Sequence, residues 1–217
     1  MSPFRYLDRI TGLFVAVLII SNIASVKIVT VGPFTFDGGT LLFPLAYIFG
    51  DVLTEVYGYR AGRRVIWTGF AALALLVVTL ALVDRLPPES TAFTAVLGQA
   101  PRIALASLIA YWAGEFTNSF VLARMKVATG GRWLWTRTIG STLVGQAVDT
   151  TVFVVVAFYG VLPDGDVAAI LISNYVFKVA VETALTPLTY AVVTALKRAE
   201  GVDAFDRDTD FNPLVLQ

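Results

Sequence analysis

Cysteine and histidine are both absent from this chain of 217 residues. Without cysteine, the chain has no disulfide, no thiolate nucleophile and no thiolate metal site. Without histidine, it lacks the commonest general base and the commonest metal ligand. Charge is scarce as well, at 15% of residues, and the 16 basic residues balance the 16 acidic ones. We therefore expect no metal site, no cofactor and no nucleic-acid partner, since nucleic-acid binding proteins carry a basic surface.

Apolar sequence is what the chain has in abundance, with 57% hydrophobic residues. A membrane-spanning helix needs about 20 mostly apolar residues. Six segments meet this need, at about 10–31, 39–59, 64–84, 102–123, 134–162 and 167–197. We predict an all-α polytopic membrane protein with six transmembrane helices in a lipid bilayer. The first segment follows Arg5 and Arg9 as in a signal peptide, but it is long enough to span, so we expect it to stay uncleaved.

Two domains of unequal size follow from this division. Residues 1–198 form the six-helix transmembrane domain, and residues 199–217 form an acidic cytoplasmic C-terminal tail. The tail sequence, GVDAFDRDTDFNPLVLQ from residue 201 on, is polar and acidic. Terminal segments of this composition are often mobile. We therefore expect a mobile, soluble terminus.

Positive charges are distributed unevenly between the predicted connections. One side has only Arg85 and Arg102. The other side carries Arg5, Arg9, Arg60, Arg63, Arg64, Arg124, Lys126, Arg132, Arg137, Lys197 and Arg198. Because cytoplasmic loops carry the excess of lysine and arginine, we predict that both termini are cytoplasmic. In this interpretation Arg60, Arg63 and Arg64 anchor the inner end of the second segment.

Ionisable and amide side chains interrupt the apolar segments. Each charge at the centre of a helix in the bilayer costs about 2.5–3.5 kcal/mol, so such residues face one another or water. Helical spacing supports this: Asp51 and Glu55 lie one turn apart, and Asn174, Lys178 and Glu182 form one stripe. We predict a binding site made of Asn22, Asp51, Glu55, Trp112, Glu115, Asn118, Gln146, Asp149, Asn174, Lys178 and Glu182.

These residues also allow a purely structural explanation, in which they hold the helices together and bind no ligand. Ion pairs and hydrogen bonds between helices also fix packing, and Lys178 is able to pair with Glu182 or with Asp51. However, five acids face two lysines in the predicted spans, so some carboxylates lack a cation. Such carboxylates are protonated, exposed to a water-filled cavity, or available for a ligand that donates hydrogen bonds.

The chemistry of the predicted site favours a small, flat, nitrogen-rich solute. Carboxylates accept paired N–H bonds from amidine-like or guanine-like edges. Aromatic side chains such as Trp112 stack on planar heterocycles, although a deep tryptophan is more often a packing residue. A sugar phosphate or another anion fits such a site less well.

Four stretches of the chain resemble the queuosine precursor transporter family, also called the vitamin uptake transporter-like family. They are SNIASVKIV, FDGGTLLFPLAYIFGDVLTEVYGYRAGRRVIWTGF, RTIGSTLVGQAVDTTVF (137–153) and SNYVFKVAVETALTPLTYAVV (173–193). The resemblance extends over residues 10–198. In the second stretch, acids, a proline and aromatics stand at fixed spacing. Most predicted site residues lie in these stretches, whereas Glu115 and Asn118 depend on helical spacing.

Membership of this family implies a multi-pass protein of the bacterial cell inner membrane. It implies import of 7-cyano-7-deazaguanine or 7-aminomethyl-7-deazaguanine, the flat, guanine-like precursors of the modified tRNA base queuosine. A homodimer is in keeping with the resemblance, and no enzymatic activity is expected.

Two other functions are open from the residues. Asp51 and Asp149 loosely match the facing aspartates of an intramembrane aspartyl hydrolase, although the local motifs of that class are missing. The polar stripes also suit a non-transporting membrane subunit or an ion-conducting pore, although no ring of identical residues is visible.

Overall fold

The computed structural model describes residues 4–24, 27–31, 34–37, 39, 42–87, 92–94, 101–160 and 163–215. Its long elements correspond to the six predicted segments. The helices are α1 (Leu7–Ala24), α2 (Phe43–Tyr57), α3 (Tyr59–Val83), α5 (Pro101–Ala128), α6 (Leu134–Phe158) and α7 (Asp164–Glu200). Strands β1 (Ile28–Val31) and β2 (Phe34–Asp37) form an antiparallel hairpin between α1 and α2.

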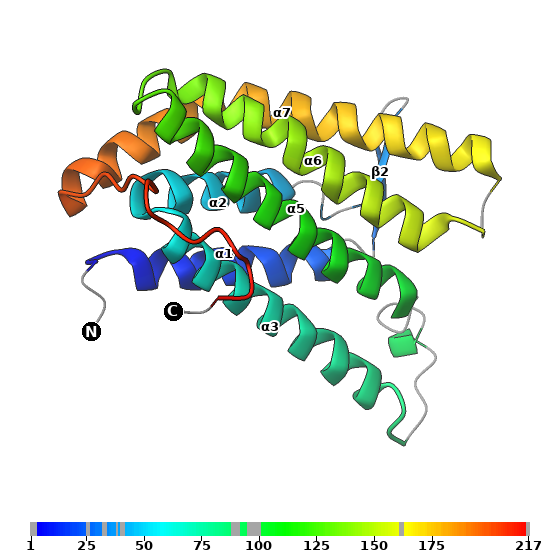
Figure 1. The fold of residues 1–217 in the computed structure, drawn as a ribbon. Coiled ribbons are helices and arrows are strands. Elements are labelled where there is room, and N and C mark those ends of the chain that lie inside the picture. Colours follow the sequence, from blue (N-terminus) through cyan, green and yellow to red (C-terminus); the bar gives the residue numbers. More distant parts are fainter. Residues whose placement is uncertain are drawn as a thin grey trace.

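The helices form one elongated bundle (Figure 1). The start of α1 and the end of α7 lie at the same end of it, which we call the terminal end. Hydrogen bonds join these two segments directly, because Glu200 accepts the backbone N–H groups of Arg5 and Tyr6 at 2.8 and 2.7 Å. The short helix α2 is enclosed among the longer helices, and every residue from Gly50 to Tyr57 is buried.

The first predicted span was wrong at its C-terminal boundary. We expected a helix to about residue 31, but α1 ends at Ala24 and the chain then enters β1, where Ile28 pairs with Asp37. The segment after Lys27 is rich in β-branched residues, which favour strands. A short apolar run does not separate a helix from a strand by hydrophobicity alone. The hairpin is therefore a departure from the all-α prediction.

Among the residues that the structure describes, four helical segments are long and apolar enough to cross a membrane. They are Leu7–Ala24, Tyr59–Val83, Leu134–Phe158 and Ile170–Glu200. Helix α2 has 15 residues and is therefore about 22 Å long, against about 30 Å for the hydrocarbon core of a bilayer. The structure thus supports an α-helical membrane protein, with α2 as a short, enclosed element of the bundle.

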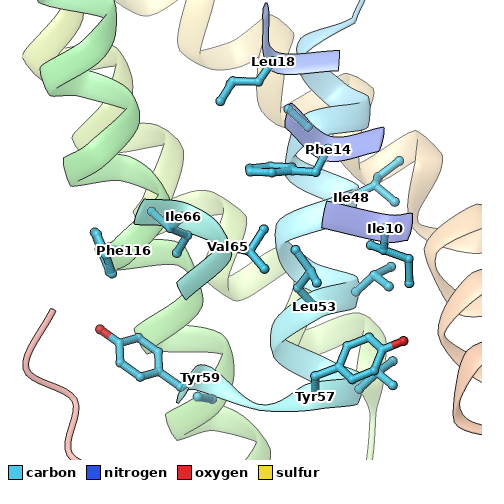
Figure 2. Packing of buried hydrophobic residues seen from close by; sticks show 14 of the residues in the cluster. Ile10, Phe14, Leu18, Ile48, Leu53, Tyr57, Tyr59, Val65, Ile66 and Phe116 are labelled. Atoms are coloured by element: carbon cyan, nitrogen blue, oxygen red, sulfur yellow. The ribbon is translucent and has the colours of Figure 1, made fainter. Parts of the chain in front are cut away.

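The apolar core lies between α1, α2, α3 and α5 near the terminal end. Figure 2 shows Phe14 and Leu18 of α1 facing this core, together with Leu53 of α2, Ile66 of α3 and Phe116 of α5. Phe14 is fully buried and Leu53 is 1% exposed. Burying a large apolar side chain contributes about 1.5–3 kcal/mol in water-soluble proteins. This core fixes α2 and α5 against each other, and both helices carry predicted site residues.

The C-terminal tail, residues 201–215, packs on the bundle and does not behave as the mobile terminus that we expected. It returns across the helices after α7 ends (Figure 1). The tail residue Asp206 is buried and accepts the Tyr59 N–H at 2.9 Å. Trp67 donates its indole N–H to the Pro213 carbonyl at 2.8 Å. A polar composition predicted mobility, but this segment has acceptors that match donors on α3.

Arg63 was interpreted as a topology anchor, and the structure adds a specific contact with the tail. Its side chain is 1% exposed. The guanidinium donates to the carbonyl oxygens of Asp210 and Asn212 at 2.8 and 2.7 Å. Its neighbours Arg60 and Arg64 are exposed, as an anchor requires. A count of positive charges in the sequence does not distinguish a buried arginine from an exposed one, because the contact of Arg63 with the packed tail forms only in the folded chain.

Candidate functional site

Asp51 and Asn118 meet in the centre of the bundle. Asp51 lies on α2 and Asn118 on α5, and both are buried. The Asn118 side-chain N–H donates to the Asp51 carboxylate at 2.8 Å. No cation bonds to Asp51 among the described residues. The pair is therefore held by one hydrogen bond and leaves acceptor capacity on both side chains.

Glu182 of α7 faces α6 at the same centre. Thr142 donates its hydroxyl to one carboxylate oxygen at 2.6 Å, and the Gln146 amide donates to the other at 3.3 Å. Glu182 also interacts electrostatically with Asp51 and Glu115. Two neutral donors thus orient a buried carboxylate without neutralising its charge.

Asp149 of α6 and Lys178 of α7 form the ion pair of this region. The ammonium nitrogen lies 2.6 Å from an Asp149 oxygen, and Lys178 is the more exposed partner, at 17% against 6%. The hydroxyl of Tyr47 on α2 also hydrogen-bonds to Asp149. The sequence allowed Lys178 to pair with Glu182 or Asp51, but the partner in the structure is a third acid.

Glu115 of α5 is 1% exposed and points at the backbone of α2. An added Cβ at Gly50 would lie 1.8 Å from the Glu115 Oε1, so any larger residue there would displace this carboxylate. Oε1 has no hydrogen-bond partner among the described residues. Glu115 interacts electrostatically with Glu182 and Asp149. It therefore completes a set of four buried acids that interact with one another, of which Asp149 is paired with Lys178.

The central polar group, as we call it, combines seven of the eleven predicted site residues. These are Asp51, Glu115, Asn118, Gln146, Asp149, Lys178 and Glu182. Three of its oxygen acceptors are buried and have no partner in the described part of the chain: Glu115 Oε1, Asn118 Oδ1 and Gln146 Oε1. Unpartnered buried acceptors are costly and need an explanation. A ligand that brings hydrogen-bond donors supplies one.

Close contact between α5 and α6 brings this group together. An added Cβ at Gly114 would lie 2.6 Å from the Asp149 Cβ, and one at Gly145 would lie 2.8 Å from the Asn118 Cβ. Small residues allow helix backbones to approach in this way. Gly114 therefore lies opposite Asp149, and Gly145 lies opposite Asn118, so the close contact of the two helices brings both polar residues into its centre.

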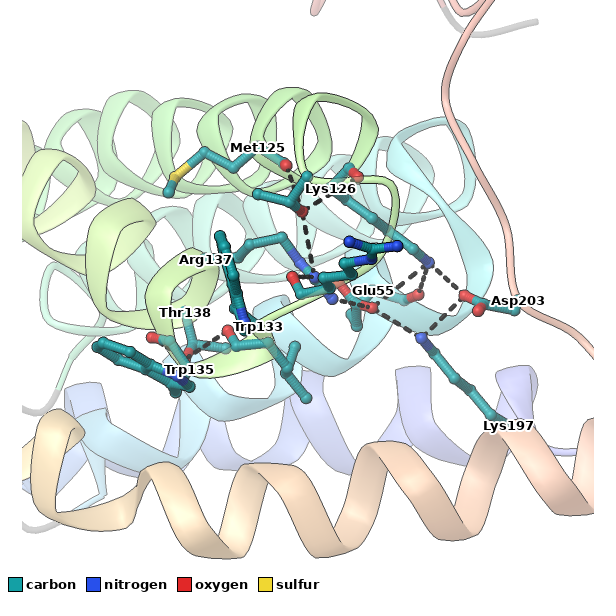
Figure 3. Close-up of polar contacts among 12 residues, drawn as sticks. Glu55, Met125, Lys126, Trp133, Trp135, Arg137, Thr138, Lys197 and Asp203 are labelled. Atoms are coloured by element: carbon teal, nitrogen blue, oxygen red, sulfur yellow. Dashed lines mark hydrogen bonds and ion pairs between the residues drawn. The ribbon is translucent and has the colours of Figure 1, made fainter.

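Glu55 belongs to a different place, although we predicted it in the binding site. Figure 3 shows it at the centre of a charged network, which we call the Glu55 cluster: Glu55, Lys126, Arg137, Lys197 and Asp203. Arg137 and Lys197 each lie 2.7 Å from the Glu55 Oε1, and Lys126 lies 3.5 Å from it. Glu55 is 0% exposed. Its charge is compensated within the protein.

Asp203 of the tail completes the Glu55 cluster. It accepts Lys126 at 2.5 Å and Lys197 at 2.8 Å, and its side chain is 46% exposed. Partial burial raises the pKa of Asp203, but the hydrogen bonds from Lys126 and Lys197 and the positive charges of these two lysines together lower it by more, so the net shift of this pKa is downward. Asp203 is therefore the solvent-facing member of an otherwise enclosed network.

Three predicted site residues are not joined to the central polar group by any contact in the described part of the structure. The Asn22 amide donates to the Leu18 carbonyl within its own helix at 2.9 Å. Asn174 is partly buried. Trp112 packs against the rings of Trp67 and Phe116, with centroids 6.2 and 5.4 Å away. Packing is thus the observed role of Trp112.

Sequence reasoning missed several residues that the structure adds. Tyr47 contacts a central acid, and so does Thr142, which shares a helical face with Gln146 but was not among the predicted site residues. Lys126, Arg137 and Lys197 were counted only as positive charges of the inner loops, yet they enclose Glu55. No local pattern marks these three as partners of one acid, because their separations along the chain are long.

The chain is similar to known transporters. Residues 37–192 match the family described as "Putative vitamin uptake transporter". The chain is 33% identical over 189 residues to the "Probable queuosine precursor transporter" of Bacillus subtilis (strain 168), with 83% of this chain and 82% of that protein covered. It is 26% identical over 225 residues to the "Queuosine precursor transporter" of Escherichia coli (strain K12), with 89% and 91% covered.

No solved structure matches the chain. The family match alone covers more than half of the residues, and it contains every member of the central polar group. The chain therefore belongs to the vitamin uptake transporter family, and its similarity to queuosine precursor transporters confirms the resemblance found in its sequence.

Proposed function

We propose that this protein imports queuosine precursors, 7-cyano-7-deazaguanine or 7-aminomethyl-7-deazaguanine, for tRNA modification. The names of its relatives in two bacteria support the substrate class. The structural observation that carries the proposal is the surplus of buried acceptors in the central polar group. The group has four acids and one lysine, and one oxygen each of Glu115, Asn118 and Gln146 has no partner in the described part of the chain. A solute rich in N–H donors satisfies this surplus.

The guanine-like edge of a deazaguanine suits these acceptors. Its ring N–H and exocyclic amine lie side by side and are able to bind one carboxylate together. Glu115 has an oxygen free for such a pair, and the carbonyl oxygens of Asn118 and Gln146 are further acceptors. Lys178 bonds to Asp149 in the structure. An exchange of this partner on binding would couple occupancy to movement of α6 and α7.

The central polar group is buried, so we infer that a solute enters and leaves only when helices move. Asp51, Glu115, Asn118 and Gln146 are each at most 2% exposed. Transporters of the alternating-access type expose such a site to one side at a time. The described structure supports a closed form of this cycle, and the short α2 at its centre would be protected from lipid by the longer helices.

We propose the bacterial inner membrane as the location, with six spans and both termini in the cytoplasm. The positive charges support this orientation, since their excess lies before and at the start of α1, at the start of α3, around the connection from α5 to α6 and at the end of α7. A homodimer remains a proposal drawn from the family resemblance.

An aspartyl hydrolase fits the geometry less well than a transporter. Its two aspartates share one proton across a short distance. Here Asp51 accepts from Asn118, and Asp149 is paired with Lys178, so the two side chains have different partners. We therefore propose no enzymatic activity. A non-transporting subunit or a pore is distinguished by experiment, because neither gives saturable uptake that guanine-like analogues compete for.

The test is uptake of labelled 7-cyano-7-deazaguanine and 7-aminomethyl-7-deazaguanine into bacteria that cannot synthesise them. The Glu115→Gln and Glu182→Gln variants should lose about tenfold or more of the uptake rate, because a lost charged hydrogen bond costs about 1.5–3 kcal/mol. Asp8→Asn is the matched control, since Asp8 is exposed at the start of α1. Normal uptake by both glutamine variants would refute the proposed site.

A further inference from the structure

The Glu55 cluster joins the same helices that carry the central polar group. Its members lie on α2 (Glu55), α5 (Lys126), α6 (Arg137) and α7 (Lys197), with Asp203 in the tail (Figure 3). Asp51 is one helical turn before Glu55, a rise of about 6 Å along α2. A solute that leaves the central polar group toward the terminal end therefore meets this cluster first.

Only the tail holds the cluster together from outside the bundle. Lys126 and Lys197 both reach the Glu55 carboxylate, and Asp203 bridges the same two ammonium groups at 2.5 and 2.8 Å. Without Asp203, three cations surround a single acid. Like charges in a partly desolvated place repel one another, so loss of the bridge favours separation of α5 and α7. Asp203 is also the most accessible member of the cluster.

The tail also fixes the junction between α2 and α3. Gly58, between the two helices, has φ of +84°, a conformation that glycine adopts readily. An added Cβ there would lie 3.1 Å from the Ala204 Cβ and 3.3 Å from the Asp206 oxygens. The Ala204 N–H donates to the Val56 carbonyl at 3.2 Å. The tail thus covers the one glycine at which α2 is able to change its direction relative to α3.

We propose that the C-terminal tail is a latch that closes the terminal end of the bundle, and that Asp203 leaves the Glu55 cluster when this end opens to a solute. This proposal rests on the proposed transport function, because transport is what gives the opening of the terminal end a role. Its physical content is independent of the solute, because it concerns the contact of Asp203 with Lys126 of α5 and Lys197 of α7. The tail has no helix or strand after Glu200, so it is able to detach without unfolding the bundle.

A single thiol measures the opening directly, because the chain has no cysteine. Ser141 is fully buried on α6, one turn beyond Arg137, and its hydroxyl bonds only within its own helix. In the full chain purified in detergent, Ser141→Cys should react slowly with a membrane-impermeant maleimide. Adding Asp203→Asn should raise the labelling rate about tenfold, which corresponds to a shift of about 1.4 kcal/mol in the opening equilibrium.

Asp208→Asn is the matched control. It removes the same charge from the same tail, and Asp208 is exposed with no ion pair among the described residues. Equal labelling rates in the Asp203→Asn and Asp208→Asn proteins would overturn the proposal. If Asp203→Asn does not yield folded protein, Lys197→Gln takes its place, with the exposed neighbour Arg198→Gln as control. Failure of both test variants to fold would identify the contacts as structural only.

The labelling test uses no solute, so it separates the two proposals. Faster labelling in the Asp203→Asn protein, together with no deazaguanine uptake by the parent chain, would support the latch and refute the proposed substrate. Uptake of deazaguanine by the parent chain, together with an unchanged labelling rate in the Asp203→Asn protein, would support the proposed substrate and refute the latch.

Discussion

At the scale of single residues, the structure assigns different roles to acids that look alike in the sequence. Glu55 and Glu115 are both glutamates in apolar helices and both are buried. Each has one buried oxygen without a hydrogen-bond partner, but Glu55 is surrounded by three cations, whereas Glu115 lies against Gly50 with no ion pair among the described residues. A compensated acid holds helices together, and an uncompensated one is available for a ligand.

Gly50 gives a residue-scale prediction. Gly50→Ala should displace the Glu115 carboxylate, because the added Cβ would lie 1.8 Å from Oε1. We expect the uptake rate to fall at least about tenfold while the protein still folds, since the end of a flexible side chain is able to rotate away. Gly12→Ala on α1 is the control, since nothing lies within 4 Å of an added Cβ there. Uptake that falls equally in both variants would contradict this role of Gly50.

At the scale of elements, α3 depends on a distant segment for its start. Its N-cap residue is Gly58, which has no side chain to accept a backbone N–H. Asp206 supplies the missing acceptor by bonding to the Tyr59 N–H, and the negative charge suits the N-terminus of a helix. Asp206 therefore caps α3 from a position 147 residues away along the chain.

The capping role predicts a measurable loss of stability. Asp206→Ala should destabilise the folded protein by about 0.5–2 kcal/mol, the usual cost of removing a helix N-cap. The measurement is the thermal unfolding midpoint in detergent. Asp208→Ala serves for comparison, because Asp208 lies in the same tail and is exposed. Equal midpoints for the two variants would show that the tail does not stabilise α3.

At the scale of the whole molecule, two polar layers are built on the same four helices. The central polar group and the Glu55 cluster each draw one or more residues from α2, α5, α6 and α7. Any displacement of these helices changes both layers together. This arrangement links the proposed binding of a solute to the proposed opening of the terminal end.

Ligand binding should therefore stabilise the molecule as a whole. A solute that binds only the folded protein adds about 2.7 kcal/mol to its stability at 100 times its Kd. We expect 7-cyano-7-deazaguanine or 7-aminomethyl-7-deazaguanine to raise the unfolding temperature of the purified protein. Glu115→Gln should abolish this rise, whereas Asp8→Asn should keep it. A rise of equal size in both variants would place the binding site elsewhere.

The sequence by itself determined the helical segments, the family and the presence of buried acids, because each follows from local composition and spacing. Runs of about 20 apolar residues predict helices in lipid, and i, i+4 spacing places Asp51 beside Glu55. It did not determine the end of α1, since an apolar run rich in β-branched residues fits a strand equally well.

Only the tertiary structure decided which charges meet. Lys126, Arg137 and Lys197 lie 71, 82 and 142 positions from Glu55, so no periodicity connects them to it. The order of the tail has the same origin, because Asp203 and Asp206 bind donors that only folding brings within reach. Pairing energy depends on distance in space and on burial, and neither is a local property of the sequence.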